Sequence, residues 1–211
     1  MNLDQDGAAP SDRFRMKLLE AMLELAPDMG WSASSFEAAR QRCGLTQGEA
    51  DLACPGGVGD LLTAFHHLMS AKVGTRIGDA DLAGMKVRDK VTFGVQAYLD
   101  ALEPFRPAVR RAMASPLNVF AGPKGLWSVA DAIWSGLGDR STDFNWYSKR
   151  TILSGVISST LLVWLAGDGD ETDAFLRRRI ADVMTFEKTK ARVRSFFTSP
   201  TTEAAPPGAG S

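Results

Sequence analysis

An acid, two large aromatic residues and an arginine recur at helical spacing in one stretch of the chain. Asp143, Trp146, Tyr147 and Arg150 stand at i, i+3, i+4 and i+7, so a helix places them on one face. Aromatic and arginine side chains dominate the binding energy of protein interfaces. The stretch therefore predicts a recognition surface, although the same spacing also fits two core aromatic residues with a charged, solvated rim.

Patterns for catalysis and for metal binding are missing from the sequence. His66 and His67 are adjacent, so on a helix they point about 100° apart and do not chelate one ion together. The run 56–59, Gly-Gly-Val-Gly, follows no predicted strand and has no adjacent lysine, which favours a turn over a phosphate-binding loop. No Glu-x-x-His pair and no set of nucleophile, base and oxyanion donor is present. We expect a protein that is not an enzyme and that needs no metal or cofactor.

The composition allows one sizeable core. The 211 residues are 45% hydrophobic, and the first residues, 1–7, hold acids and no apolar run, so no secretory signal is expected. Cys43 and Cys54 are too few for a disulfide scaffold, and free thiols in a reducing compartment are expected. From Phe175 onward, seven basic residues stand against three acidic ones, an asymmetry that bears on partners.

Helical periodicity runs through the chain, and strand-like alternation does not. The pattern predicts an all-α protein, with disordered tails at residues 1–11 and 198–211. The expected helices span residues 12–29, 34–42, 47–53, 58–77, 87–102, 105–114, 125–137, 141–166 and 171–197.

The first three predicted helices have the layout of a helix-turn-helix unit at residues 12–56, followed by a helical bundle at 57–197. Ser34 is expected to cap the second helix, Gly44 to end it and Thr46 to cap the third. The would-be recognition helix, Thr46 to Ala53, holds Glu49 and Asp51 and no Lys or Arg. Phosphate neutralisation supplies most non-specific DNA affinity. Because this unit is net acidic, we expect no nucleic-acid partner.

Two long helices of the bundle differ in character. Thr151 to Gly167 carries no charge but is shorter than the ~20 residues of a membrane span, and its apolar residues fall all round the helix, which indicates a central helix of a soluble bundle. The last helix, 171–197, combines an apolar stripe with a basic face. That face fits an anionic membrane surface, where each cation contributes ~1 kcal/mol, and equally fits a bundle helix with cations near its C-terminus. The expected membrane-facing residues are Arg177, Arg178, Lys188 and Arg192.

A helix-turn-helix unit followed by long helices resembles the tetracycline-repressor (TetR) architecture. The run Ser141 to Tyr147, with Gly138-Asp139 before it and Lys149-Arg150 after it, resembles the signature of the accessory protein nine family of coenzyme Q (ubiquinone) biosynthesis. The stretch Leu25 to Trp31 resembles that family's opening helix, and likeness extends over about residues 13–195.

The resemblance implies a TetR-like fold that has lost DNA binding. It also implies a non-enzymatic protein that binds lipids, including isoprenoid quinone intermediates, in a bundle pocket and presents them to the demethoxyubiquinone hydroxylase. Ile133 stands where the family often has methionine, and the Pro, Ala and Gly residues after 198 replace a membrane-docking helix that relatives can carry. The family's partner-binding positions correspond to Asp131, Ile133, Trp134, Asp143, Trp146, Tyr147 and Arg150.

We therefore expect a cytoplasmic, homodimeric lipid carrier that associates peripherally with the inner membrane. A TetR-type ligand-responsive transcriptional regulator and a quinone-modifying enzyme are the alternatives. The inward-facing apolar residues expected to line the lipid pocket are Leu126, Val129, Ile133, Leu153, Ile157, Leu161 and Trp164.

Overall fold

Helices account for all the regular secondary structure that is described. The computed structural model describes residues 9–115, 123–167 and 169–198, without the side chains of 123, 143 and 184–198. Over that part the all-α prediction is confirmed, and each predicted helix begins and ends within two residues of an observed one. The elements are α1 (Pro10–Met29), α2 (Ala33–Arg42), α3 (Gln47–Ala53), α4 (Val58–Gly78), α5 (Val87–Leu102), the 3-10 turn η1 (Glu103–Phe105), α6 (Arg106–Met113), α7 (Pro123–Gly136), α8 (Asp143–Ala166) and α9 (Gly169–Thr198).

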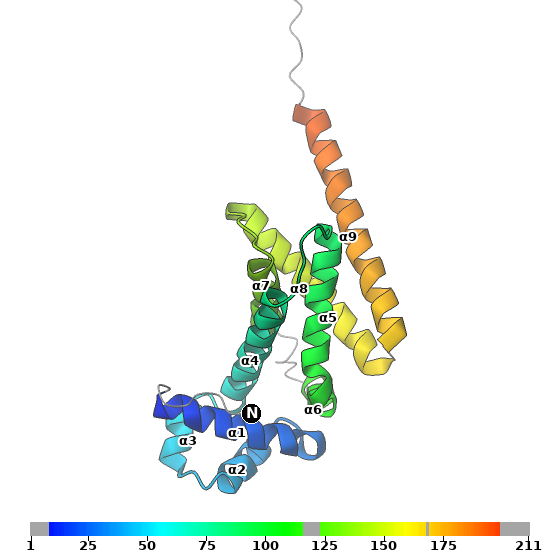
Figure 1. Ribbon diagram of the computed structural model, residues 1–211. Coiled ribbons are helices and arrows are strands. Elements are labelled where there is room, and N and C mark those ends of the chain that lie inside the picture. The colour runs from blue at the N-terminus through cyan, green and yellow to red at the C-terminus, as the bar shows by residue number, and fades with distance from the viewer. Residues whose placement is uncertain (1–8, 116–122, 168, 199–211) are drawn as a thin grey trace, which may run out of the picture.

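Helices α1, α2 and α3 pack together at one end of the molecule (Figure 1). Gly44, at φ 66°, makes the tight turn after α2, a left-handed conformation that glycine adopts at little cost. Thr46 then caps α3 through a reciprocal pair of hydrogen bonds with Glu49, as its position predicted. The α2 cap is Ser32 rather than the expected Ser34, because the Ser32 and Ser35 side chains each accept the other's backbone N–H.

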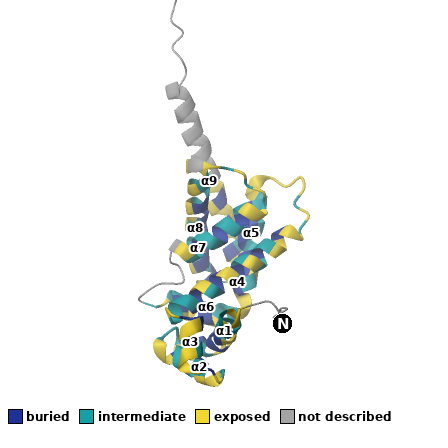
Figure 2. Cartoon of the chain, turned by 90° about the vertical axis from the view of Figure 1, so that its left-hand side faces the viewer, coloured by how far each residue is buried: buried dark blue, intermediate teal, exposed yellow. Residues whose placement is uncertain are grey.

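The remaining helices form a bundle in which α7 packs on α4 and α8, while α9 packs on α8 and α5. Two glycines permit close approach: a Cβ on Gly94 would lie 2.7 Å from Cγ2 of Ile133, and one on Gly125 would lie 2.4 Å from Nε2 of His66. Dark-blue buried residues follow the inner faces of α4, α5, α7 and α8 in Figure 2. The close contacts hold α7 against both neighbours, and Ile133 is fully buried as a result.

The charge-free part of α8, from Thr151 onward, is buried on one face only. Leu153, Ile157 and Leu161 lie in the core, whereas Leu162 is 58% exposed. The prediction of a helix surrounded on all sides is therefore wrong, because no described helix covers the Leu162 face. None of the helices, over the residues that are described, has the length and hydropathy to cross a membrane.

Arginines of α6 fix the ends of two other helices. Arg106 donates to the carbonyls of Trp164 and Gly167, and Arg110 donates to the Leu165 carbonyl at 2.6 Å. Arg111 donates to the Pro27 carbonyl at the end of α1 at 2.8 Å. These guanidinium groups satisfy carbonyls that a helix C-terminus leaves without intrahelical partners. Through α6 they connect the C-terminal end of α1 to the C-terminal end of α8.

Candidate functional site

The first two turns of α8 present aromatic side chains to solvent. Phe144 is 75% exposed and Tyr147 is 60% exposed. Trp146 is half-buried and packs edge-on against Tyr147, with ring centroids 4.7 Å apart, and against Trp127 of α7 at 5.6 Å. We call Trp127, Phe144, Trp146 and Tyr147 the aromatic patch. Phe144 was not among the predicted contact residues, although helical spacing from Tyr147 indicates it. Trp127 lies on another helix, so the spacing within α8 gives no signal for it.

Arg150, expected on the same exposed face, points inward instead. Its side chain is only 2% exposed, and its Nε donates to Asp131 at 2.6 Å. Its Nη1 lies 3.3 Å from Asp139, and its guanidinium stacks over the Trp146 ring at 4.1 Å. The predictions that Arg150 and the buried Ile133 contact a partner directly are therefore corrected: both support the surface from beneath. The Asp143 side chain lies outside the described residues.

Asp139 is the hub of this buried ion-pair network. Its side chain is 6% exposed and accepts from Lys149 at 2.7 Å, from the Ser141 hydroxyl at 2.6 Å and from Arg150. Burial alone would raise the pKa of Asp139, but the hydrogen bonds from Lys149 and Ser141 and the lysine charge lower this pKa to about 2. The carboxylate is thus held ionised by two cations that follow one another on α8.

The depressed pKa of Asp139 predicts a loss of stability in acid. Since the folded pKa of about 2 lies below the ordinary value of 3.8, the stabilisation is complete above about pH 4 and disappears as the pH falls toward 2. At ~1.4 kcal/mol per pKa unit, this group contributes about 2 kcal/mol. Chemical denaturation from pH 6 to pH 2 should show a shallower pH dependence for Asp139→Asn than for wild type. The exposed Asp100→Asn is the control, and equal slopes for all three proteins would contradict the prediction.

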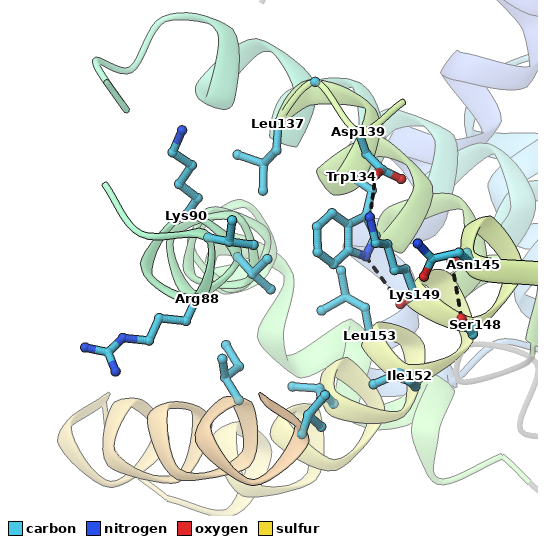
Figure 3. A pocket seen from close by; sticks show the side chains of 16 residues that line it. Arg88, Lys90, Trp134, Leu137, Asp139, Asn145, Ser148, Lys149, Ile152 and Leu153 are labelled. Carbon is cyan, nitrogen blue, oxygen red and sulfur yellow. Dashed lines mark hydrogen bonds and ion pairs between the residues drawn. The ribbon is translucent and has the colours of Figure 1, made fainter. Parts of the chain in front are cut away.

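A cavity of about 420 Å³ opens beside this network, between α5, the end of α7, α8 and α9. Its size falls in the range of roughly 300–1,000 Å³ that is usual for small-molecule pockets. In Figure 3 the Trp134 ring faces the cavity, with Lys149 and Asp139 together at its far edge and Arg88 and Lys90 on the α5 side. The apolar wall includes Val91, Leu137, Ile152, Leu153, Val156 and Ile180.

The cavity differs in its lining from the lipid pocket predicted from the sequence, which stays a prediction. Of the residues predicted to line it, only Leu153 does so. Trp164 is held elsewhere, because its indole N–H donates to Glu103 at 3.0 Å and Arg106 stacks on its ring at 4.8 Å. Helical spacing could not distinguish a wall residue from one packed against a neighbouring helix. The predicted residues that lie in the closed core instead are Leu126, Val129, Ile133, Ile157, Leu161 and Trp164.

Four of the other predicted residues have a described environment. Trp134 belongs to the cavity rather than to the aromatic patch, and its indole N–H donates to the Lys149 carbonyl at 3.3 Å. Asp131 is 44% exposed and pairs with Arg150. On α9, Arg177 and Arg178 are exposed, whereas the side chains of Lys188 and Arg192 lie outside the described residues.

Fold and site together define a helical protein with an amphipathic cavity next to an exposed aromatic patch and with no cluster of metal-ligating side chains among the residues described. The family model for COQ9 matches residues 119–187, which include α7, α8 and the first half of α9. The chain is 30% identical to "Ubiquinone biosynthesis protein COQ9, mitochondrial" of Bos taurus, and 29% and 27% identical to the proteins of that name in Rattus norvegicus and Homo sapiens.

Each of these alignments covers 91% of this chain. The chain spans 66% or 67% of the length of these three relatives. It belongs to the COQ9 family of ubiquinone biosynthesis proteins. Membership supports a role in ubiquinone biosynthesis.

Proposed function

We propose that this protein is a non-enzymatic lipid carrier that takes up isoprenoid quinone intermediates and presents them to the demethoxyubiquinone hydroxylase. The observation that carries the proposal is the placement of the cavity and the aromatic patch on the same turns of α8. Asn145, Ser148 and Lys149 line the cavity. Phe144 and Tyr147, which alternate with them along the same two turns, are exposed to solvent. A lipid in the cavity would thus lie directly under a protein docked on the patch.

The apolar wall of the cavity suits an isoprenoid chain. Val87 at the rim is 52% exposed, so the apolar lining continues from Val91 and Leu153 to the solvent. Each CH₂ taken out of water stabilises the bound state by roughly 0.8 kcal/mol, so a few isoprene units supply strong binding. The interaction needs no movement of the closed core.

A cavity-filling substitution tests the lipid site. Ile152 is part-buried and lines the cavity, so Ile152→Trp should occupy the space of the chain and reduce co-purifying prenyl lipid at least tenfold. Native mass spectrometry and lipid extraction of the purified protein measure this. Leu162→Trp, on the exposed face of the same helix, is the matched control and should leave the lipid content unchanged. Wild-type protein that carries no prenyl lipid, together with normal ubiquinone in a deletion strain, would contradict the proposal.

We further propose a peripheral, homodimeric protein at the inner membrane, with α9 toward the lipid. The cationic pair Arg177 and Arg178 is exposed there, and near-surface cations contribute about 1 kcal/mol each on anionic membranes. The relatives are named mitochondrial, and the cytoplasmic placement expected from the sequence stays a prediction. So does the homodimer.

Neutralising Arg177 and Arg178 tests the proposal that α9 faces the membrane. Arg177→Gln with Arg178→Gln should weaken sedimentation with phosphatidylserine vesicles by roughly 10- to 30-fold, and added salt should erase the difference. Arg13→Gln with Lys17→Gln on α1, a different helix in the three-helix unit of Figure 1, removes the same charge as a control. Equal binding by the two double variants would argue against α9 as the membrane face.

The first three helices are proposed to be a TetR-like unit that does not bind DNA. The basic residues of α2 are engaged within the protein, since Arg40 pairs with Glu37 at 2.6 Å and Arg42 with Glu24 at 2.5 Å. The exposed face of α3 offers Asp51 and no cation. Salt-sensitive, sequence-selective DNA binding would instead favour a transcriptional regulator, for which no comparison gives support.

A further inference from the structure

We propose that the cavity also binds an amphiphile with an anionic head group, which Lys149 holds in competition with the neutral quinone, and that its occupancy is transmitted to the aromatic patch through Asp139 and Arg150. The inference rests on the cavity being a lipid site, as proposed above. It adds the chemistry of the head group and a link between the cavity and the patch. The two sites share the buried carboxylate of Asp139, which makes such a link physically possible.

The lining of the cavity has an excess of positive charge. Among the described lining residues, Arg88 and Lys90 lie on the α5 side and Lys149 at the opposite edge, against the single carboxylate of Asp139. That carboxylate is already saturated by Lys149, Ser141 and Arg150, so it offers little to an incoming cation. Lys149 is 31% exposed and carries three N–H donors, so it can reach a ligand. The edge therefore favours an anionic head over a neutral or cationic one.

Binding of a ligand by Lys149 would also disturb its ion pair with Asp139. Its ammonium lies 2.7 Å from Oδ1 of Asp139, whereas Arg150 lies at the longer distance of 3.3 Å from Oδ2. When an anionic head attracts Lys149, Asp139 loses its nearest cation. The charge of Arg150 must then compensate a carboxylate that is only 6% exposed, because a buried anion without a partner is strongly disfavoured.

Arg150 carries this change to the surface. Its Nη1 bonds the Trp146 carbonyl at 3.3 Å as well as Asp139, and its guanidinium plane stacks on the Trp146 ring. A shift of Arg150 toward Asp139 therefore moves the support of Trp146, which contacts Tyr147 edge-on. By linkage, a protein docked on the patch must alter the affinity of the cavity by the same factor. Binding of the ligand in the cavity and binding of the partner protein on the patch would thus be coupled.

The two tyrosines of the chain provide a direct readout. Tyr147 lies in the patch, and Tyr98 is completely buried in α5, so fluorotyrosine labelling gives one reporter and one internal reference by ¹⁹F NMR. The probes are decyl phosphate and decanol below their micelle concentrations, with inorganic phosphate as the head group without a tail. Decyl phosphate should bind and shift the Tyr147 resonance while Tyr98 stays in place. Decanol should bind more weakly and leave Tyr147 unmoved.

Variants separate the head-group contact from the transmission. Lys149→Gln should weaken decyl phosphate binding at least tenfold and decanol binding less than twofold, and Lys17→Gln on α1 is the charge-matched control. Asp139→Asn, compared with wild type at saturating decyl phosphate, should lose at least half of the Tyr147 shift. If Asp139→Asn does not fold, the comparison of the Tyr147 shift in wild-type protein with decyl phosphate and with decanol still tests the proposal.

The other outcomes are distinguishable. Equal Tyr147 shifts with decanol and decyl phosphate would overturn the head-group route and leave the lipid cavity standing. Binding of decyl phosphate without any Tyr147 shift would overturn the transmission alone. A shift with inorganic phosphate alone would mean that the edge binds free anions rather than lipids. Absence of binding by both amphiphiles would overturn the inference together with the lipid site of the proposed function.

Discussion

Replacing Arg150 by methionine should lower the free energy of unfolding by about 3 kcal/mol, because it removes the cation at the centre of the buried network. Breaking a buried ion pair costs roughly 3–5 kcal/mol when one charge is left uncompensated. The lower end applies here, since Asp139 keeps Lys149 and Asp131 is 44% exposed to water. Methionine fills most of the arginine's volume, so the loss measures the charge and its hydrogen bonds rather than a cavity. Urea denaturation at pH 7 measures the difference.

A nearby surface arginine offers the control for this substitution. Arg140 is exposed in the loop before α8, and Arg140→Met should change the free energy of unfolding by less than about 0.5 kcal/mol. Arg150→Lys should fall between the two, because an ammonium keeps the charge but not the planar fork that reaches Asp131 and Asp139 together. If Arg150→Met retained wild-type stability and lost only partner binding, the result would favour the direct partner contact that the sequence predicted for Arg150.

Replacing Tyr147 by alanine should weaken hydroxylase binding by about 2 kcal/mol or more, roughly 30-fold, while the thermal midpoint changes little. Exposed aromatic side chains in contact with other aromatic residues are the usual centres of binding energy at interfaces. Tyr147 is 60% exposed, so little of its area is buried within the free protein. Calorimetric titration with the purified hydroxylase measures the affinity, and scanning calorimetry measures the midpoint.

Two comparisons make the Tyr147 result specific. Leu162→Ala truncates another exposed large side chain on α8 and should leave hydroxylase affinity within about twofold. Phe144→Ala should weaken binding as Tyr147→Ala does, since Phe144 is 75% exposed. Trp146→Ala should lose both binding and stability, because its ring is half-buried over the Arg150 guanidinium. Normal affinity in both Tyr147→Ala and Phe144→Ala would remove the patch from the docking surface.

These predictions assign different tasks to neighbours on one helix. Tyr147 and Arg150 are three residues apart, yet one offers its side chain to solvent and the other is 2% exposed. Lys149 lies between them in sequence and lines the cavity. The predictions therefore assign docking, support and ligand binding together to the first turns of α8. Substitutions there need a stability measurement beside each binding measurement.

The helices and many of their ends could be read from the sequence. Periodicity placed the helices, Gly44 and Thr46 marked the break and the cap around α3, and the run from Ser141 to Arg150 marked the site. These features depend on backbone sterics, capping hydrogen bonds and the spacing of apolar residues along a few turns. Such interactions are local, so the order of residues is enough to predict them.

The tertiary structure alone decided which way the side chains of that site face and where the cavity lies. Arg150 turns inward because Asp131 of α7 and Asp139 of the α7–α8 loop reach it there, and neither contact follows from the spacing within α8. The cavity forms where α5, α7, α8 and α9 fail to fill the space between them, near Leu153 rather than Leu161. Helical spacing determines which residues share a face, but only the packing of one helix on another determines whether that face meets solvent, a cavity or the core.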